Sequence, residues 1–172
     1  MTLIALTGLS VALLLALSSL KKGNDVPIVE NSSMQYIYVP PPEAAPYLSV
    51  AYETEQREGI PRNLLVKLLE TESNFNPNAL NVSSNAQGIA QIVPRWHPNV
   101  DPYNADEAIP YAGHYLRTLY EQFGDWRKAL AGYNWGPGNL QKALNEHGFD
   151  WISVAPRETR EYIDKISTGV IT

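Results

Sequence analysis

Glu72 is the residue whose type and setting most directly suggest chemistry. It follows an apolar stripe at helical spacing and precedes the break at Asn76-Pro77. The stripe consists of Leu64, Leu65, Leu68 and Leu69. Glycosidic cleavage needs a proton donor for the leaving oxygen, and a carboxylic acid serves well if burial raises its pKa. On position alone, however, Glu72 is more simply explained as a surface carboxylate at a helix end.

Three sequence blocks change this interpretation. They are Glu72-Ser73-Asn74-Phe75-Asn76-Pro77-Asn78-Ala79, then Ser83-Ser84-Asn85-Ala86-Gln87-Gly88-Ile89-Ala90-Gln91-Ile92-Val93-Pro94, and finally Ala131-Gly132-Tyr133-Asn134-Trp135-Gly136-Pro137-Gly138-Asn139. Their order and spacing resemble the signature blocks of the soluble lytic transglycosylase (SLT) family. This goose-type-lysozyme-like group cleaves the glycan strands of bacterial cell walls. The resemblance covers residues 47–166, and it favours Glu72 as the catalytic acid.

The resemblance also explains why no second carboxylate accompanies Glu72. No Asp or Glu occurs between Ser73 and Val100, although most glycosidases pair two carboxyl groups. Members of the family use one glutamate as acid and then as base. The C6 hydroxyl of the sugar attacks within the same molecule, so proximity replaces the second carboxylate. The expected product is a 1,6-anhydromuramyl end, and no metal or cofactor is implied.

Further site residues follow from the same resemblance. The expected substrate-binding set is Ser73, Ser84, Gln91, Tyr133, Asn134 and Tyr162. We expect Tyr133 to contact the catalytic acid, because a buried phenol usually needs a hydrogen-bond partner. Two alternatives stay open: Gln91 as an amide that satisfies loop backbone, and Tyr162 as a simple packing residue.

The second block departs from the commonest family form. Asn85 stands where many members have glycine, Ala90 replaces the usual methionine, and the segment before them is one residue longer. The substrate-contacting serine of the family therefore falls on Ser83 or Ser84, with Ser84 favoured. Ala90 predicts a smaller wall in the sugar groove.

Aromatic residues suggest where sugars could stack. Trp135, inside the glycine-rich block, is the best candidate. We expect Trp96 and Trp151 to pack in the protein interior instead.

The elements that must position these residues are mainly helical. Apolar spacing and breakers predict helices over 47–58, from Pro61 onward, and over 108–123, 126–133 and 157–167. The break at Gly136-Pro137-Gly138 ends the fourth of them. No stretch alternates as a strand, apart from a small irregular hairpin between Val82 and Ile92. The predicted fold class is mainly α, a lysozyme-like SLT domain over residues 47–172.

The N-terminal part differs in composition. Residues 3–20 form an apolar run long enough to span a bilayer, which predicts a transmembrane anchor over residues 1–22. Gly8, Ala12 and Ala16 recur at a spacing that permits helix–helix association. A cleaved signal peptide is the alternative. Residues 23–46 contain several prolines and predict an extended tether.

Charge and composition exclude several functions. The net charge of −5 gives no electrostatic argument for a nucleic-acid partner, and the chain has no cysteine for disulfides or thiolate chemistry. His97, His114 and His147 are widely separated and do not suggest a metal site. The family resemblance implies peptidoglycan glycan strands as a partner, and the apolar run over residues 3–20 predicts a membrane as another.

The sequence thus predicts a membrane-anchored lytic transglycosylase that cleaves MurNAc-β-1,4-GlcNAc bonds from the cell-wall side, the periplasm. Lys21-Lys22 follow the apolar run, which by the positive-inside rule favours the opposite orientation. This conflict suggests the hypothesis of an enzyme carried in a bacteriophage particle or its internal membrane. The rival functions are a hydrolytic lysozyme of the same fold and a non-catalytic wall-binding or assembly protein.

Overall fold

The computed structural model describes residues 25–30 and 33–171. The chain divides into two compact units, residues 1–41 and 42–172. Within the described residues, no helix is both long and apolar enough to cross a membrane. The apolar run 3–20, on which the expected anchor and its helix association depend, lies outside the described residues.

The first unit contains a hairpin where we expected an extended tether. Strand β1 (Asp25–Glu30) pairs antiparallel with β2 (Ser33–Tyr38), and Asp25 lies opposite Tyr38. The prediction of a tether over 23–46 is therefore wrong for these residues. β-branched and aromatic residue types favour strands, and both segments contain several of them. The prolines of this region concealed that signal.

The second unit is mainly helical, as predicted. In chain order its helices are η1 (Pro42–Tyr47), α2 (Leu48–Glu58), α3 (Leu64–Ser73), α4 (Ala105–Phe123), α5 (Trp126–Trp135), α6 (Pro137–His147), η2 (Gly148–Asp150), α7 (Trp151–Val154) and α8 (Arg157–Ser167). A short hairpin, β3 (Leu80–Asn81) and β4 (Ala86–Gln87), separates α3 from α4. This hairpin confirms the expected irregular pairing after Val82, although it begins slightly earlier.

Local sequence explains where most helices begin and end. Gly59 ends α2 in the left-handed conformation that glycine adopts without steric cost, and Asn74 ends α3 in the same way. The Asp125 side chain accepts a hydrogen bond from the Lys128 N–H at the start of α5. These signals made the predicted bounds of α2, α5 and α8 nearly correct.

Helix α6 was not predicted. We interpreted Gly136-Pro137-Gly138 as a break, whereas Pro137 is the first residue of α6. Proline is well tolerated at this position, because its missing N–H would have no partner within the helix. The motif therefore ends α5 and begins α6 at once.

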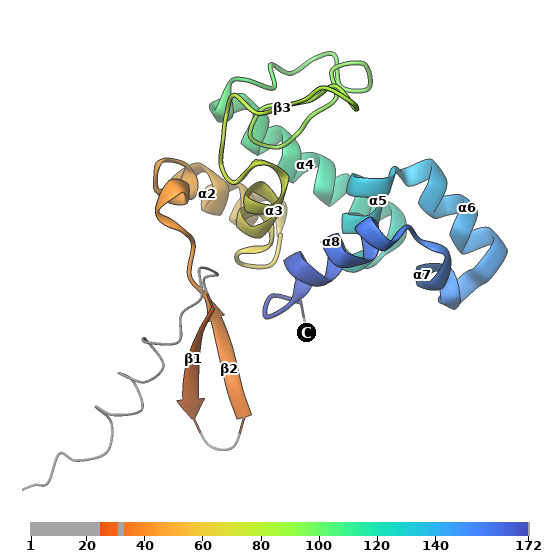
Figure 1. Cartoon of the computed structure of the whole chain (residues 1–172), viewed down its shortest axis with the longest axis horizontal. Coiled ribbons are helices and arrows are strands. Elements are labelled where there is room, and N and C mark those ends of the chain that lie inside the picture. The colour runs from red at the N-terminus through yellow and green to blue at the C-terminus, as the bar shows by residue number, and fades with distance from the viewer. Residues whose placement is uncertain (1–24, 31–32, 172) are drawn as a thin grey trace, which may run out of the picture. The chain divides into compact units, whose positions relative to one another are not determined.

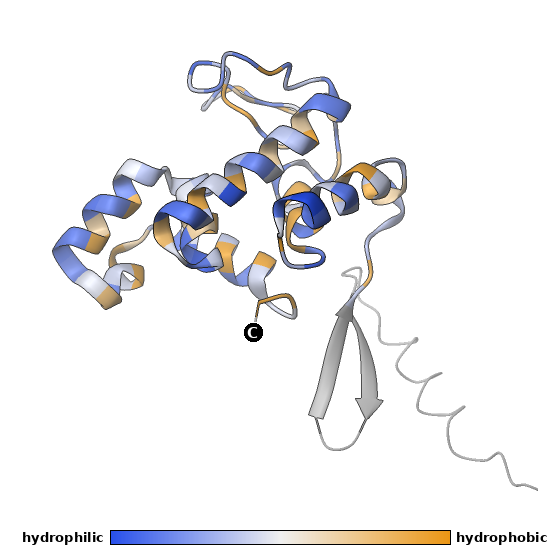
Figure 2. Cartoon of the chain, turned by 180° about the vertical axis from the view of Figure 1, so that it is seen from behind, coloured by the Kyte–Doolittle hydropathy of each residue, from blue (hydrophilic) through white to orange (hydrophobic). Residues whose placement is uncertain are grey.

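The core of the second unit lies between α3 and the helices around it. In Figure 1, α8 lies between α3 and α5, and both contact it. Figure 2 shows the apolar sides of the helices facing one another and the hydrophilic sides facing outward. The largest fully buried side chains include Leu64, Leu65, Leu68, Leu69, Ile109, Leu116, Leu119, Leu130, Ile163 and Ile166. Each contributes on the order of 1.5–3 kcal/mol by its burial.

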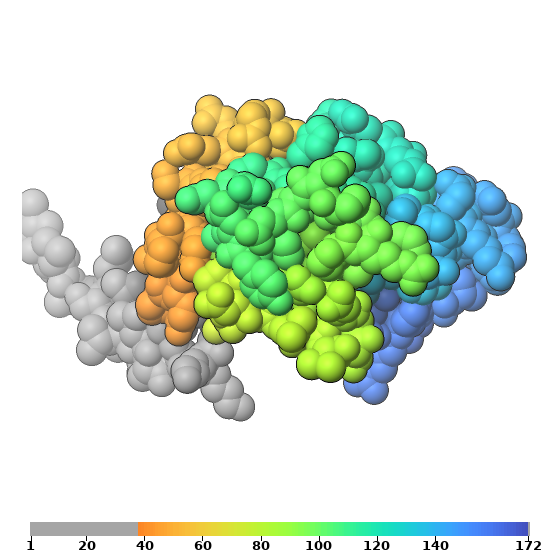
Figure 3. Space-filling view, turned by 90° about the horizontal axis from the view of Figure 1, so that it is seen from above, coloured from red at the N-terminus to blue at the C-terminus, as the bar shows by residue number. Residues whose placement is uncertain are grey.

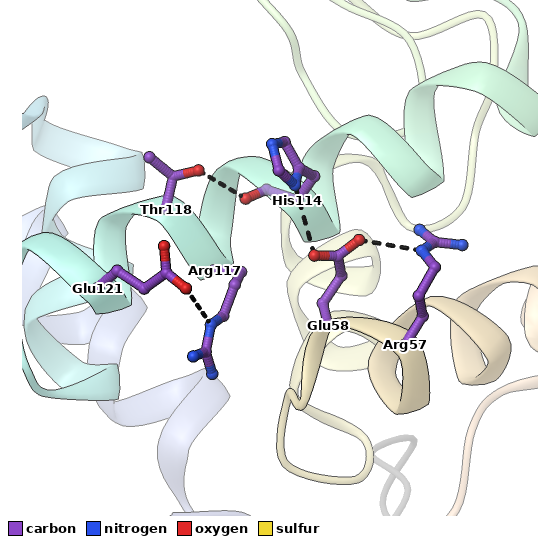
Figure 4. Close-up of polar contacts among 6 residues, drawn as sticks. All are labelled: Arg57, Glu58, His114, Arg117, Thr118 and Glu121. Carbon is purple, nitrogen blue, oxygen red and sulfur yellow. Dashed lines mark hydrogen bonds and ion pairs between the residues drawn. The ribbon is translucent and has the colours of Figure 1, made fainter.

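Helix α4 crosses α2 at close range. A Cβ atom on Gly113 would lie 2.3 Å from Cγ2 of Thr54, so only glycine permits this approach. Outside the contact, His114 Nδ1 lies 3.4 Å from Oε2 of Glu58, and Arg57 pairs with the same carboxylate (Figure 4). These exposed pairs add little stability, whereas the crossing fixes α4 relative to α2 and α3.

Loop residues cover one face of the helical unit. Seen from above, the segment from the β3–β4 hairpin to the start of α4 spreads across this face between α2–α3 and α6 (Figure 3). The segment is anchored at Gly88, where an added Cβ would lie 1.6 Å from the Pro102 carbonyl oxygen. Gly88 also has a φ of +72°, so both the close approach to Pro102 and the backbone conformation require glycine there.

Candidate active site

Glu72 lies in the last turn of α3. The chain then turns sharply, because Asn74 and Phe75 both adopt left-handed conformations with φ of 53° and 60°. That conformation is costly for a phenylalanine, and the site tolerates it because the Phe75 ring is buried. The turn separates the end of α3 from the β3–β4 hairpin and leaves Glu72 beside α8.

Tyr162 of α8 donates a short hydrogen bond to Glu72. Its hydroxyl lies 2.6 Å from Glu72 Oε1. Sequence reasoning left Tyr162 open as a packing residue, and the structure instead places its hydroxyl on the carboxyl group. Because α8 packs against α3, a residue ninety positions along the chain becomes the nearest polar neighbour of Glu72.

The environment of Glu72 keeps its carboxyl group protonated to unusually high pH. The residue as a whole is only half-buried, but its carboxyl group is buried, and burial raises its pKa from 4.5 to about 7. The hydrogen bond from Tyr162 opposes this rise, the negative charge of Glu158 adds to it, and the charge of Lys165 opposes it. At neutral pH a large fraction of Glu72 therefore carries a proton that it can donate.

Tyr133 makes a different contact from the one we expected. Its hydroxyl donates to the carbonyl oxygen of Ala90 at 2.9 Å, so the expected hydrogen bond to the acid comes from Tyr162 instead. Sequence spacing did not reveal this backbone acceptor in the turn before Gln91, and a contact of Tyr133 with the acid stays a prediction. Burial, and next the charge of nearby Glu72, raise the pKa of the Tyr133 phenol well above its usual value. Tyr133 is therefore a close neighbour of the acid that holds the turn.

Ser73 also stabilises the turn that precedes Gln91, by a hydrogen bond to its backbone. Its hydroxyl lies 2.7 Å from the carbonyl oxygen of Ile89 and accepts a hydrogen bond from the N–H of Asn76. We expected Ser73 to bind substrate, but these contacts join the end of α3 to the turn at Ile89. Ser73 and Tyr133 thus donate to the carbonyl groups of two consecutive residues, Ile89 and Ala90.

The two candidate serines lie in the turn of the β3–β4 hairpin. Ser83 and Ser84 are exposed, and both donate their backbone N–H to the side-chain oxygen of Asn81. The Ser84 hydroxyl accepts from the N–H of Ala86 at 3.3 Å. Asn85 follows with a φ of 58°, which explains why asparagine can replace the family's glycine here.

Gln91 has a left-handed backbone conformation, and only the nitrogen of its side-chain amide makes a hydrogen bond within the described residues. Its φ is 49°, and its amide Nε2 donates to the carbonyl oxygen of Gly88. The amide thus satisfies loop backbone, which was the alternative we considered. The side-chain oxygen accepts no hydrogen bond within the described residues, so Gln91 can also meet a ligand.

A cleft of about 880 Å³ opens between the loop segment and the helices. α4 contributes Tyr111, Ala112 and Tyr115 to the lining, and residues 132–139 form another part of it. The loop segment contributes Gln91, Ile92, Val93, Trp96 and His97. Three expected site residues, Gln91, Tyr133 and Asn134, line it together with Trp135. Ser73, Ser84, Glu72 and Tyr162 are not lining residues. Because the charge of Glu72 acts on Tyr133, the acid lies next to the wall that Tyr133 forms.

The tryptophans divide differently from our expectation. Trp135 lines the cleft as predicted, and Trp151 is buried. Trp96 is 68% exposed and lines the cleft, so the prediction that it packs inside is wrong. Trp96 lies in a loop, and a loop has no sequence periodicity from which the exposure of a side chain could be predicted.

Sequence reasoning missed three cleft residues and one carboxylate. His97, Tyr111 and Tyr115 line the cleft, and Glu158 influences Glu72 from α8. The only sequence signal was the spacing of Tyr111 and Tyr115, which places both on one face of a helix. Within the described residues, no group of His, Cys, Asp and Glu is arranged to hold a metal ion.

Two named relatives are similar to this chain in sequence. Membrane-bound lytic murein transglycosylase D of Escherichia coli (strain K12) is 29% identical over 139 residues, which cover 72% of this chain and 30% of that protein. Membrane-bound lytic murein transglycosylase C of Mannheimia succiniciproducens is 41% identical over 149 residues, covering 74% of this chain and 42% of the relative. The chain therefore spans less than half the length of these relatives.

The fold is similar to that of a solved structure. An inactive mutant of the lytic transglycosylase Slt from Pseudomonas aeruginosa superimposes with a TM-score of 0.60 at 20% identity, over 72% of this chain and 23% of that one. The transglycosylase SLT domain family matches residues 49–153, which include Glu72, the β3–β4 hairpin and the cleft. The chain belongs to the transglycosylase SLT domain family.

Proposed function

We propose that this chain is a lytic transglycosylase that cleaves the β-1,4 bond between MurNAc and GlcNAc in peptidoglycan. One observation carries the proposal: a buried carboxyl group with a pKa of about 7 accepts a hydrogen bond from a phenol and lies next to Tyr133, which lines a cleft of about 880 Å³. The relatives named lytic murein transglycosylases support the same reaction. A pKa near the working pH suits a group that must first donate and then accept a proton.

In the first step Glu72 acts as the general acid. Its proton passes to the glycosidic oxygen, the C1–O bond of MurNAc breaks, and GlcNAc leaves with a free 4-hydroxyl. Positive charge then develops at C1, where the family resemblance implies assistance from the sugar's own N-acetyl group. Glu72 is left as a carboxylate that keeps the hydrogen bond from Tyr162, so the charge forms in a prepared environment.

In the second step the Glu72 carboxylate acts as the base. It removes the proton from the C6 hydroxyl of MurNAc while that oxygen bonds to C1. The product is 1,6-anhydroMurNAc, and Glu72 regains its proton. No water enters the balance, and the nucleophile needs no second carboxylate because it belongs to the same sugar.

A hydrolytic lysozyme is the second candidate. It would need a positioned water and a second carboxylate, and Glu158 is the carboxylate whose charge acts on Glu72. Glu158 is exposed on α8 and makes no hydrogen bond or ion pair within the described residues. An exposed, unsupported carboxylate is a poor holder of a catalytic water, so the lytic reaction is favoured.

For location, we infer an anchored enzyme whose helical unit faces the cell wall. The relatives are named membrane-bound, and residues 3–20 are mostly apolar and carry no charge. Residues 1–22 are the proposed anchor. Deleting them should move the protein from the membrane fraction to the soluble fraction of a cell lysate. Retention in the membrane fraction would contradict the anchor without affecting the proposed chemistry.

The reaction is tested by mass spectrometry of muropeptides released from purified peptidoglycan by the full chain. Glu72→Gln removes the proton donor and keeps the side-chain shape, so release should fall by a factor of about 10²–10⁴. Glu70→Gln is the matched control, because it removes a carboxylate from the same helix two residues earlier. Its products should equal those of the unmodified chain.

Three product patterns distinguish the candidates. Anhydro-muropeptides from the unmodified chain and from Glu70→Gln support the proposal. Products with reducing ends, which are heavier than anhydro-muropeptides by one water, indicate hydrolysis. Glu158 is then the candidate second carboxylate. Absence of products from every variant contradicts both reactions and leaves a wall-binding role.

A further inference from the structure

Part of the cleft is lined by residues outside the three family blocks, namely His97, Tyr111 and Tyr115. Trp96 and Trp135 also line the cleft. The lining contains no Asp, Glu, Lys or Arg side chain. An uncharged cleft rich in aromatic rings suits a neutral ligand that has apolar faces and polar edges.

Two tyrosines of α4 fix the ring of His97. Its Nδ1 lies 2.8 Å from the Tyr111 hydroxyl, and its edge meets the Tyr115 ring with centroids 4.8 Å apart. Tyr115 in turn contacts Tyr133 at 5.7 Å. A continuous series of rings therefore leads from His97 to the neighbour of the catalytic acid, and the orientation of the imidazole is set before any ligand binds.

The second nitrogen of His97 remains for a ligand. Its Nε2 makes no hydrogen bond in the part of the chain that the structure describes, and no carboxylate there pairs with the ring. Burial lowers the pKa of His97, so the ring is mostly neutral at pH 7. A neutral imidazole engaged at Nδ1 offers one further donor or acceptor at Nε2.

We propose that His97 is a substrate-binding residue whose Nε2 hydrogen-bonds the polar edge of an N-acetylhexosamine ring in this part of the cleft. The inference rests on the proposed function and extends it, because it assigns a specificity-determining group to a sugar site away from the cleaved bond. Such a ring would lie against tryptophan and tyrosine side chains and place its hydroxyl and amide groups at His97. Tyr111 is the positioning residue, since it acts through the imidazole.

The variants separate the role of Nε2 from that of the ring. In His97→Asn the amide can still meet the Tyr111 hydroxyl, but nothing replaces Nε2. In His97→Gln the longer side chain carries an amide nitrogen towards the position of Nε2. His114→Asn is the matched control, because His114 lies on the same helix as Tyr111 but is exposed beside Glu58 (Figure 4).

The experiment measures binding of N-acetylchitotetraose to the full chain by calorimetry, in a Glu72→Gln background that prevents cleavage. His97→Asn should bind about ten-fold more weakly, as expected for one lost hydrogen bond. His97→Gln should recover part of that loss, and His114→Asn should bind unchanged. With Glu72 present, His97→Asn should raise KM for soluble glycan strands more than it lowers kcat.

Two results would overturn the inference. One is unchanged affinity in His97→Asn. The other is absence of binding by the chain with His97 intact, even if muropeptide analysis shows that the same protein cleaves peptidoglycan. Melting temperatures guard against misfolding, and Tyr111→Phe, which keeps His97 but frees its ring, should weaken binding in the same direction. If the chain with Glu72 and His97 intact does not cleave peptidoglycan, while the sugar-binding results are as expected, the proposed function alone is contradicted.

Discussion

Two carboxyl groups lie at opposite ends of helix α3, and their surroundings differ. Glu55 of α2 is 2% exposed and meets the start of the helix, where its oxygens accept from the N–H groups of Asn63, Leu65 and Val66 at 3.0–3.3 Å. Glu72, in the last turn, accepts one hydrogen bond from a phenol. Burial raises the pKa of both groups, but only at Glu55 do three backbone bonds oppose it.

The two ends of one helix give two glutamate side chains opposite electrostatic surroundings. A helix start has unpaired N–H groups and a positive dipole end, which stabilise a carboxylate. The last turn has the negative end, which disfavours one. Glu55 therefore fixes the start of α3 and with it the position of Glu72. Glu72 lies where losing its proton is costly, so it retains that proton for donation.

The largest expected effect in this comparison is on stability as a function of pH. The unfolded chain has an ordinary Glu72 pKa of 4.5, whereas the folded chain has about 7. Between these values the native state binds more protons, so stability is full below pH 4.5 and falls as pH rises through 7. Glu72→Gln should remove this loss and be about 3 kcal/mol more stable than the unmodified chain at pH 8. Urea denaturation of the unmodified chain and of Glu72→Gln at pH 4.5 and at pH 8 measures this difference in stability. A difference that is the same at both pH values would contradict the prediction.

Glu55→Gln should lower stability without removing chemistry. A glutamine offers one acceptor oxygen to three N–H groups and adds an amide that needs partners of its own, which should cost about 2 kcal/mol. Denaturation midpoints measure that cost. The folded fraction should keep its kcat, and a large fall in kcat at full folding would show that Glu55 does more than fix the helix.

Tyr162→Phe should alter both rate and pH dependence. The substitution removes the 2.6 Å hydrogen bond from Tyr162 to Glu72. Because that bond lowers the pKa of the Glu72 carboxyl group, the pKa should rise above about 7 in the variant. Because the general acid must be protonated, cleavage declines above the pKa, and this decline should move to higher pH. We also expect a rate about ten-fold lower, from the lost orientation of the acid. Tyr133→Phe, which loses only the bond to the Ala90 carbonyl, is the control for the direction of the shift.

The smallest expected effect belongs to Glu158→Gln. The negative charge of Glu158 raises the pKa of Glu72, so its removal should move the decline in activity to lower pH. Glu158 is exposed, and the shift should vanish near 1 M salt, where screening acts over about 3 Å. Glu161→Gln, on the same helix but paired with Arg157, should not change the pH profile. A shift that persists in high salt would mean that Glu158 acts by contact.

Most helices could be predicted from sequence, because their signals are local. Gly59 ends α2, and an apolar stripe marks α3. Helix α6 was missed because Gly136-Pro137-Gly138 has two local interpretations, a break and a helix start. The hairpin of β1 and β2 was missed because proline content outweighed strand-forming residues in our interpretation.

The site was predictable only where a residue's role is recorded in a short motif. Glu72 stands in such a block, and its carboxyl group is buried beside Tyr162, while its catalytic role stays a prediction. The exchange of roles between Tyr133 and Tyr162 was not predictable, because it depends on how α8 packs against α3. His97 was missed for the same reason: the tyrosines that hold it come from another element, and periodicity does not say which helix face meets a cleft.

Glu72 holds its proton near neutral pH, whereas Glu55 fixes the start of α3. A carbon-13 NMR titration of the side-chain carboxyl groups tests this directly, with signals assigned through Glu72→Gln and Glu55→Gln. We predict that the Glu72 signal titrates near pH 7 and moves upward in Tyr162→Phe. A midpoint near 4.5 would contradict the claim, because the carboxyl group would then have no proton to donate at neutral pH.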